Sequence, residues 1–410
     1  MYKFLGELIN VDQAVRKGVD KIEFKLETLE VSVWDARGYI LAEDIYASIN
    51  QPPFHRSAVD GFAVKAEDTF GASPLNPITL RIKGSLKPGD KPGIKIDHGE
   101  AVEVSTGAPL PQGADSVIMV EDVDIVNNYI RVHKPVPKWA NVSRLGEDYS
   151  RGDLLVSKNT VLKPHDLAII ASSGYKYVKV YRRLSVGILC SGDEVVEPGQ
   201  PLSGGEVYNS TGVLIKNYLD EMPFIKTYYY GIVGDQKSLL RDFIEKLIGK
   251  HDLLITSGGA GVSGVDVLRD VVEELGEYVF RGVAMRPGRP TSLALINNKP
   301  VFMLSGYPVA AWTGLEALVK PIIYGSLGIE VPAKPIVKAL LTRRTPNVIG
   351  YRSYIRVGIK RVDDKYYAEP YMLRGSGVLS SLVKTNGYII IPEDLEGYEK
   401  DSIVDVYLYS

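Results

Sequence analysis

The sequence has few of the residues that build disulfides, metal clusters or membrane spans. Its single cysteine, Cys190, excludes an internal disulfide and cysteine metal clusters. Its five histidines are scattered, with no pair at i and i+4, so a histidine metal site has little support. No apolar run approaches the roughly 20 residues that a membrane helix needs, and the N-terminus is too charged for a signal peptide. We therefore expect a cytoplasmic protein without a membrane partner.

The charge of the chain has no dominant sign. The formal net charge is -2, with 48 basic and 50 acidic residues. Such a balance creates no overall field that attracts nucleic acid or an acidic membrane, so we expect neither as a partner. A content of 45% hydrophobic and 24% charged residues is that of ordinary globular proteins, and 410 residues are too many for one core. The chain should divide into several domains.

Several catalytic signatures are also missing. The sequence has no Ser-His-Asp pattern and no nucleophile elbow, and its glycine stretch TSGGAGVSGVD (256–266) lacks the G-K-[ST] ending of a P-loop. This stretch follows a short apolar run and precedes a helical pattern. Backbone N–H groups at such a turn, together with the positive end of the helix dipole, favour an anion. We expect it to hold phosphate.

The pattern of apolar residues changes along the chain. Helical spacing is present over 5–19 and 31–45, whereas 51–139 is rich in glycine, proline and short alternating runs that are typical of an antiparallel β domain. From Leu184, short buried strands alternate with helices, which predicts a doubly wound α/β domain with ligands at the carboxyl ends of the strands. After residue 331, five further strand-like runs predict a small β domain.

Five carboxylates lie in predicted turns rather than on helix faces: Asp60, Asp148, Glu194, Asp235 and Asp266. Any one of them alone is a plausible turn or N-cap carboxylate. Glu194, Asp235 and Asp266 follow strands or begin a helix in the same predicted sheet, so they should meet at one edge. Such a group suits Mg²⁺, which binds through one or two carboxylates, water and substrate phosphates.

The segment MRPGRP (285–290) supplies the opposite charge. Arg286 and Arg289 flank a rigid Pro-Gly turn that can aim two guanidinium groups at an oxyanion, although ion pairs with nearby carboxylates would explain them as well. Thr106 lies in the turn-rich segment TGAPLPQGAD, which is either a loop that approaches a ligand or an ordinary surface loop.

Six segments, taken in order, resemble the molybdopterin molybdenumtransferase family, which includes MoeA and the E domain of gephyrin. The resemblance spans nearly the whole chain. Its carriers are SAVDGFAV (57–64), STGAPLPQGADSVIMVED (105–122), RLGEDYSRGD (144–153), SGDEVVEPGQPL (191–202), TSGGAGVSGVD (256–266) and MRPGRPTSLAL (285–295).

The resemblance implies an enzyme that takes adenylylated molybdopterin and molybdate, releases AMP in a Mg²⁺-dependent step and leaves the metal on the pterin dithiolene. It implies an elongated homodimer whose cleft lies between the core of one subunit and the β domain of its partner, with a molybdopterin adenylyltransferase as the upstream partner. The resemblance assigns catalysis to Asp60, Asp148, Glu194, Asp235 and Asp266, with Mg²⁺ at the last three, and cofactor binding to Thr106, Ser257, Gly258, Gly259, Arg286, Arg289, Pro290 and Ser305.

The resemblance also implies the domain boundaries. They are a discontinuous N-terminal mixed helical domain (1–50 plus 141–180), an inserted β domain (51–140), a molybdopterin-binding α/β core (181–330) similar to the adenylyltransferase fold, and a C-terminal small β-barrel (331–410).

Three segments depart from the family pattern. MRPGRP has arginines where the family usually has lysines, GGAGVSGVD replaces GGVSxGxxD, and SGYP (305–308) replaces PGNP. Because a guanidinium is a planar fork and an ammonium is a compact point charge, these changes predict a different binding geometry. We hypothesise that the protein handles tungstate as well as, or instead of, molybdate.

Two other functions compete with metal insertion. One is an ATP-dependent pterin adenylyltransferase, which the α/β core favours but the β domain and C-terminal barrel disfavour. The other is an interaction scaffold, as the gephyrin E domain can be. The sequence has no partner-binding extension and no long disordered linker, which argues against a scaffold.

Overall fold

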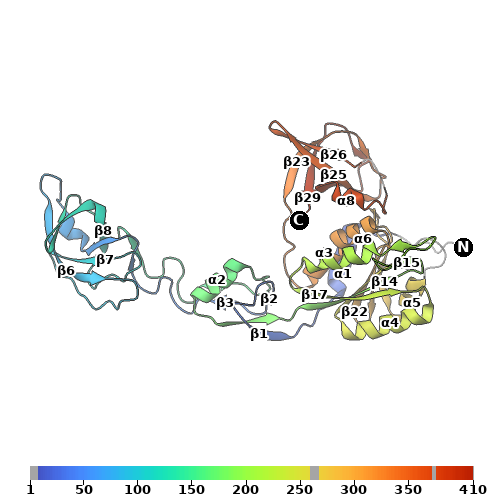
Figure 1. Ribbon diagram of the computed structural model, residues 1–410, viewed down its shortest axis with the longest axis horizontal. Helices are drawn as coiled ribbons and strands as arrows, with labels where there is room; N and C mark the ends of the chain where they lie inside the picture. The colour runs from blue at the N-terminus through green and yellow to red at the C-terminus, as the bar shows by residue number, and fades with distance from the viewer. Residues whose placement is uncertain (1–7, 259–266, 372–374, 410) are drawn as a thin grey trace.

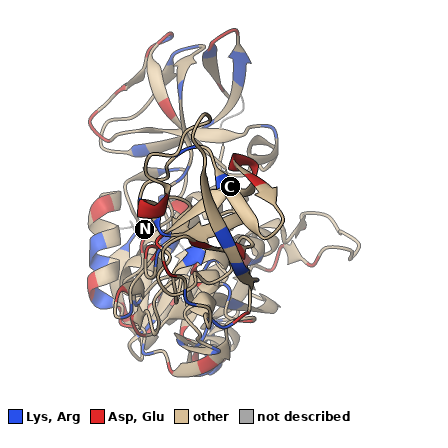
Figure 2. Ribbon diagram, turned by 90° about the vertical axis from the view of Figure 1, so that its left-hand side faces the viewer, with Lys and Arg blue, Asp and Glu red and all other residues tan. Residues whose placement is uncertain are grey.

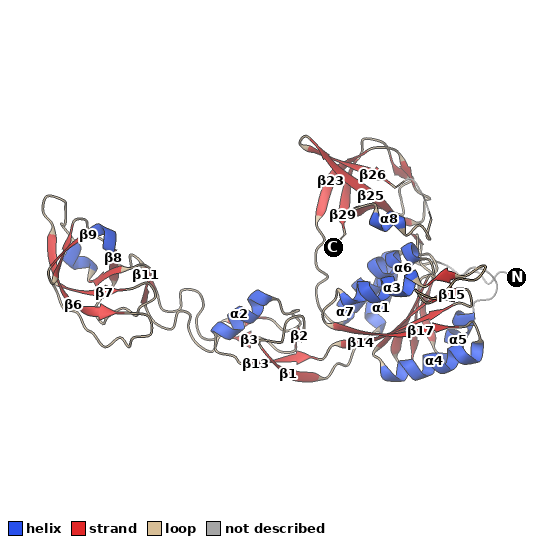
Figure 3. Ribbon diagram, viewed as in Figure 1, coloured by secondary structure: helices blue, strands red, loops and turns tan. Residues whose placement is uncertain are grey.

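The computed structural model describes residues 8–258, 267–371 and 375–409. The chain is elongated, with a β lobe at one end, a small linking lobe beside it, and an α/β core with a C-terminal barrel at the other end (Figure 1). Helices gather mainly in the core, whereas the β lobe and the barrel consist mostly of strands and loops (Figure 3). Within the described ranges, no helix is both long enough and apolar enough to cross a membrane.

The α/β core contains a six-stranded sheet. In sheet order, its strands are β17 (Ile225–Val233), β14 (Leu184–Ser191), β18 (Leu253–Ser257), β22 (Lys299–Leu304), β21 (Ser292–Ile296) and β19 (Glu277–Arg281). The first four are parallel, and β21 and β19 continue the sheet antiparallel. Strand β18 is buried throughout, as expected of a strand covered on both faces. The predicted alternation of strands and helices is confirmed.

Helices cover both faces of this sheet. One face carries α3 (Ser210–Asp220), α6 (Pro308–Gly314), the π-helical turn η3 (Leu315–Val319) and α7 (Lys320–Ser326); the other carries α4 (Lys237–Lys250) and α5 (Val267–Leu275). Helix α4 buries Leu240, Ile244 and Leu247, which recur at helical spacing on one side. The two faces have separate hydrophobic clusters, so the core is a three-layer sandwich.

Helix α1 (Val11–Lys21) begins where Asn10 caps it, because the Asn10 side chain accepts a hydrogen bond from the N–H of Gln13. It packs on α7 of the α/β core. A Cβ at Gly18 would lie 2.6 Å from Cδ1 of Ile322, so glycine allows the close approach of the two helices. The domain boundaries predicted from the sequence remain a proposal. The structure shows in addition that α1 packs on the core.

The linking lobe has two small sheets and one helix. They are β1 (Thr28–Ser32), β13 (Tyr177–Tyr181) and β2 (Ile40–Leu41), then β3 (Ile45–Tyr46) with β12 (Leu154–Val156), and α2 (Pro164–Ser172). The helix predicted over 31–45 is wrong. The chain turns at Gly38, which has φ +80°, and β1 pairs antiparallel with β13 along its full length. Pairing with a distant strand outweighed the local apolar spacing.

The β lobe is a six-stranded sheet with an additional strand pair. In sheet order, its strands are β8 (Ser116–Met119), β5 (Gly61–Val64), β7 (Glu100–Val104), β6 (Ile78–Leu86), β10 (Tyr129–Val132) and β9 (Val123–Val126), and the pair is β4 (Arg56–Ser57) with β11 (Val142–Ser143). The predicted strands are present, but the sheet is not wholly antiparallel because β6 and β7 run parallel. The long connection over 87–99 carries the chain back to the start of the next strand.

The C-terminal lobe is a closed five-stranded barrel. Around the barrel, its strands are β25 (Arg352–Val362), β26 (Lys365–Pro370), β23 (Ile336–Leu341), β29 (Ile403–Leu408) and β27 (Gly387–Ile391), and β27 pairs again with β25. Its interior contains Leu341, Val357 and Ile389, all fully buried. Closure removes free sheet edges from this small lobe. The predicted C-terminal barrel is confirmed.

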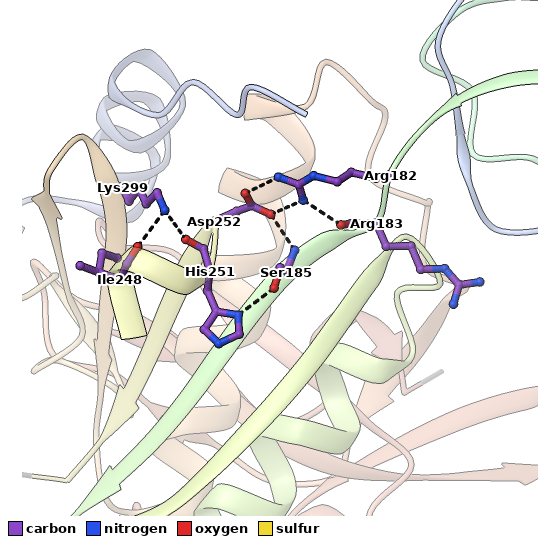
Figure 4. A network of polar contacts seen from close by, with 7 residues as sticks. All are labelled: Arg182, Arg183, Ser185, Ile248, His251, Asp252 and Lys299. Carbon is purple, nitrogen blue, oxygen red and sulfur yellow. Dashed lines mark hydrogen bonds and ion pairs between the residues drawn. The ribbon is translucent and has the colours of Figure 1, made fainter. Parts of the chain in front are cut away.

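A polar network joins the amino-terminal ends of β14 and β18 (Figure 4). Arg182 donates two hydrogen bonds to Asp252, at 2.6 and 2.7 Å. His251 contacts the Ser185 hydroxyl at 2.7 Å through Nδ1 and the Tyr230 hydroxyl at 2.8 Å through Nε2. Lys299 donates to the carbonyl oxygens of Ile248 and His251. Every group has a partner inside the fold, so this end of the sheet is structural.

The stability of the protein is expected to fall as the pH falls through the ordinary pKa of histidine, because burial lowers the pKa of His251 in the folded state below 6.5. In that window the unfolded chain binds a proton that the folded chain does not, which favours unfolding. Urea unfolding of the wild type and of His251→Asn, at about pH 8 and about pH 5, measures this contribution. An equal loss of stability in both proteins would contradict it.

Candidate functional site

Three parallel strands of the core end at the same edge. The register pairs Cys190 of β14 with Ser257 of β18, and Ser257 with Leu304 of β22. Ser257 therefore ends its strand level with Cys190 and Leu304, Ser191 and Ser305 come one residue further on, and all three serines are buried. This is the edge at which doubly wound sheets bind their ligands.

The segment MRPGRP bridges the core and the barrel. Met285 and Arg286 form the short strand β20 (Met285–Arg286), which pairs in parallel with the start of β25. The Arg286 guanidinium lies over the Tyr351 ring, 4.4 Å from its centroid. Gly288 has φ +108°, a conformation that favours glycine, and turns the chain so that Arg289 follows within the same bend.

A pocket with a volume of about 1400 Å³ lies between the strand ends and the barrel. Seven of the residues predicted from the sequence line it: Glu194, Ser257, Gly258, Arg286, Arg289, Pro290 and Ser305. A ligand of nucleotide size fits a cavity of this volume. The core and the barrel both contribute walls, so the pocket depends on how these two lobes dock.

The pocket is strongly cationic. Among the residues that the structure describes, its lining has five arginines and one carboxylate, Glu194. Figure 2 shows basic and acidic residues throughout the lobes in view, in agreement with the balanced charge of the chain. The excess of arginines in the pocket contrasts with this balance. The arginines are Arg286, Arg289, Arg343, Arg344 and Arg356. Oxyanions are the ligands that such a set of guanidinium groups recognises.

The barrel arginines are the residues that the sequence interpretation missed. Arg356 is only 7% exposed, and it donates to the Ser381 hydroxyl at 3.1 Å and to the carbonyl oxygen of Tyr354 at 3.3 Å. Burial lowers its pKa from the ordinary value, and no carboxylate among the described residues pairs with it. A signal was present in the sequence, because Arg356 interrupts the apolar run YIRVGI, which is typical of a strand and which the structure places in β25.

A group of acids lies at the same edge of the core sheet. The N–H of Asp235 donates to Asp193 Oδ1 at 3.0 Å. Burial raises the pKa of Asp235, and the carboxylates of Asp193 and Glu194 raise it further. In the described ranges, no three His, Cys, Asp or Glu side chains form a metal-binding group. Asp266 and Gly259, which the sequence also assigns to the site, lie outside the described residues.

Asp235→Asn is expected to raise the melting temperature slightly at neutral pH, since it removes a carboxylate that is repelled by Asp193 and Glu194. A raised pKa means that the folded state loses stability as the pH rises through the ordinary range of Asp. Thermal unfolding of both proteins without ligands measures the shift. A lower melting temperature in the variant would contradict this assignment of charge repulsion.

The remaining predicted residues lie outside the core and the barrel, Asp60 and Thr106 on the β lobe and Asp148 between the β lobe and the linking lobe. The N–H of Thr106 donates to Asp60 Oδ1 at 2.8 Å, so these two residues meet. Asp148 is exposed, and its N–H donates to the carbonyl oxygen of Gln51 at 3.0 Å. Strands β7 and β8, which flank β5 next to Asp60, lie at the opposite end of the chain from the core (Figure 1). Within one chain, these residues do not reach the pocket.

Three family profiles match consecutive parts of the chain. They are the MoeA N-terminal region (domain I and II) over residues 9–174, a probable molybdopterin binding domain over 187–325, and the MoeA C-terminal region (domain IV) over 338–409. The junctions between matches, at 175–186 and 326–337, fall at the entry to the core and at the linker before the barrel.

Curated relatives and solved structures match nearly the whole chain. A putative molybdopterin biosynthesis protein of Methanocaldococcus jannaschii is 39% identical over 92% of each chain. A molybdopterin molybdenumtransferase of Bacillus subtilis is 34% identical over 98% of this chain and 94% of its own. A crystal structure of a molybdopterin biosynthesis MoeA protein from Pyrococcus horikoshii has a TM-score of 0.85 at 31% identity, and covers 98% of this chain and 100% of that one.

Proposed function

Because this chain belongs to the MoeA family of molybdopterin molybdenumtransferases, we propose that it transfers molybdenum from molybdate to adenylylated molybdopterin and releases AMP. As a transferase of this family, it acts in molybdenum cofactor biosynthesis. Within this activity, the use of adenylylated molybdopterin as the substrate and the release of AMP are what we propose.

The observation that supports the proposal is the cationic pocket at the strand ends. Adenylylated molybdopterin carries a diphosphate, and molybdate is a second anion, so the reaction needs positive charge from more than one direction. Arg286 and Arg289 reach the pocket from the core, and Arg356 reaches it from the barrel. Charge-assisted hydrogen bonds from guanidinium groups hold such oxyanions and orient them toward each other.

Mg²⁺ is proposed as the ion that accompanies the diphosphate. Glu194 lines the pocket, and Asp235 lies close enough to Glu194 for that carboxylate to raise its pKa. Carboxylates that repel one another are stabilised by a cation, and two of them suffice for Mg²⁺ when the substrate supplies further oxygens. Bound there, Mg²⁺ would neutralise charge on the phosphate oxygens. Glu194 and Asp235 are the described residues that would hold it.

We propose that the protein works as a homodimer. Asp60 and Thr106 lie on the β lobe, and neither they nor Asp148 line the pocket of their own chain. An antiparallel arrangement of two elongated chains brings the β lobe of one subunit to the pocket of the other. The adenylylated substrate is proposed to come from a molybdopterin adenylyltransferase upstream. Light scattering tests the dimer, and a monomeric mass would contradict it.

The first test is AMP release from adenylylated molybdopterin with Mg²⁺, in parallel reactions without oxyanion, with molybdate and with tungstate. We expect release that depends on an oxyanion. A competition at equal concentrations then tests tungstate use, and strict selectivity for molybdate would contradict that part. No AMP release in any reaction, from folded protein that binds the pterin, would overturn the proposed function.

Variants separate an enzyme from a scaffold. Glu194→Ala and Asp60→Ala are each expected to lower the rate of AMP release about a hundredfold or more, as removal of a group that stabilises charge in the reaction does. Folding and assembly should not change, because both side chains are exposed. Unchanged AMP release in both variants would exclude the roles proposed for these carboxylates.

A further inference from the structure

Helix α3 points its N-terminus at the floor of the pocket. Asn209, Ser210 and Thr211 line the pocket where this 11-residue helix begins. The buried Asn209 side chain caps the helix by accepting a hydrogen bond from the N–H of Gly212 at 2.8 Å, and it donates to the Tyr229 hydroxyl at 2.7 Å. The N–H groups of Ser210 and Thr211 have no hydrogen-bond partner among the described residues. They are free to bind an anion.

A buried hydroxyl beside this helix provides a second, independent observation. Ser191 is 3% exposed and lines the pocket, and its Oγ has no hydrogen-bond partner. Buried hydroxyls without a partner are uncommon, and one that faces a pocket is explained by a ligand or a water that it binds. Leaving it unpaired costs roughly 1 to 3 kcal/mol.

Packing contacts hold the hydroxyl and the helix end close together. A Cβ at Gly212 would lie 2.8 Å from Sγ of Cys190, the residue before Ser191, so the first turn of α3 packs directly on the end of β14. The Thr211 hydroxyl donates to the carbonyl oxygen of Gly306 at 2.6 Å. Gly306 in turn packs on Gly258, where a Cβ would lie 3.0 Å from Ser191 Oγ. The contacts from Thr211 through Gly306 and Gly258 to Ser191 therefore connect the helix end with the hydroxyl, and all three donor residues line the same pocket.

We infer that the Ser191 hydroxyl and the N–H groups of Ser210 and Thr211 form a phosphoryl-binding subsite separate from the arginines. We name these three donors the α3 subsite. The inference rests on the proposed function, because it assigns the phosphate that stays on the pterin to the α3 subsite and the arriving metal oxyanion to Arg286, Arg289 and Arg356.

The chemistry of the two groups of donors supports this division. A phosphate ester that stays attached keeps its charge through the reaction, and fixed neutral donors at a helix end suit it. An oxyanion that arrives from solution is attracted better by full positive charges, and Arg286 is exposed at the pocket. Glu194, the carboxylate proposed to hold Mg²⁺, follows Ser191 by three residues and lines the same pocket as the α3 subsite.

Calorimetry with the full chain tests the subsite, with inorganic phosphate and molybdate as separate probes. Ser191→Ala is expected to weaken phosphate binding about tenfold or more and to change molybdate binding by less than about twofold. Ser326→Ala is the matched control, because Ser326 Oγ is also buried without a partner but lies on α7 and does not line the pocket. The control should bind phosphate as the wild type does.

A second pair of variants tests the helix end without relying on Ser191. Ser210 is the first residue of α3, where proline is tolerated but removes the N–H group. Ser210→Pro is expected to weaken phosphate binding about tenfold more than Ser210→Ala, which keeps that N–H. Equal affinities in this pair, together with an unchanged Ser191→Ala, would overturn the inference.

Two further outcomes are decisive. If wild type does not bind phosphate, or if saturating molybdate displaces all of it, there is no separate subsite and the inference fails. The AMP-release assay distinguishes this failure from failure of the proposed function. If AMP release depends on an oxyanion, but phosphate binding is unchanged in Ser191→Ala and equal in Ser210→Pro and Ser210→Ala, only the subsite is excluded. If Ser191→Ala and Ser210→Pro weaken phosphate binding as expected but the protein releases no AMP, the α3 subsite is supported and the proposed function is excluded.

Discussion

Replacing Arg356 with methionine is expected to weaken molybdate binding about tenfold or more, because a hydrogen bond to a charged group contributes roughly 1.5 to 3 kcal/mol. Arg356 is the buried guanidinium at the barrel wall of the pocket, and its pKa is lowered by burial. No carboxylate in the described ranges pairs with this charge, so a bound oxyanion would be its natural counter-ion. Equilibrium dialysis of the wild type and the variant against molybdate measures the change.

The stability of the same variant distinguishes a binding role from a structural one. Removing a buried charge that lacks an ion-pair partner should leave the free energy of unfolding unchanged or raise it, even though two hydrogen bonds are lost. Arg361→Met is the control, because Arg361 lies on the same strand, is exposed and pairs with Asp364 at 3.3 Å. Equal affinities in all three proteins would exclude Arg356 from oxyanion binding.

Glu316→Ala is expected to lower the free energy of unfolding by about 3 to 5 kcal/mol, as the loss of one partner from a buried ion pair does. Glu316 lies on η3 with its side chain 9% exposed, and its carboxylate pairs with Lys334 at 2.9 Å. It also accepts hydrogen bonds from Tyr218 at 2.6 Å and from Tyr388 at 3.2 Å. Urea unfolding measures the loss.

The carboxylate of Glu316 connects three parts of the molecule, since Tyr218 belongs to α3, Lys334 to the linker before the barrel, and Tyr388 to β27. Burial alone would raise the pKa of Glu316, but Lys334 and the Tyr218 hydroxyl hold it below its ordinary value, so the group is ionised at neutral pH. Glu316→Gln keeps an acceptor and should lose less stability. A loss below about 1 kcal/mol in Glu316→Ala would contradict the network.

Local patterns predicted the α/β core because its strands are apolar and its helices have one buried face. Strand β14, for example, is buried along almost all of its length, and α5 buries Leu268, Val271 and Val272 at helical spacing. The segment 31–45 was wrongly predicted as a helix, because its structure depends on pairing with a distant strand and not on its local pattern. Its partner strand β13 lies about 150 residues further on, and no local pattern reveals that pairing.

The same limit applies to the pocket. The rule that ligands bind where parallel strands end predicted the right edge of the core sheet, and the family resemblance assigned Ser257 and Ser305 there, without any knowledge of how the barrel docks. Arg343, Arg344 and Arg356 were missed because they reach the pocket only when the barrel docks on the core through β20 and β25. The spacing of residues in the sequence predicts structure within one lobe, whereas the walls of this pocket come from two lobes, the core and the barrel.

The distance between the β lobe and the pocket has a genetic consequence. If a working site needs Asp60 from one subunit and Arg356 from the other, two inactive alleles need not be inactive together. In a mixed dimer of Asp60→Ala and Arg356→Met chains, one site carries both defects and the other carries neither. Such a dimer should have about half the activity of the wild type. Co-expression of the two variants would then restore cofactor synthesis in cells that neither variant rescues alone.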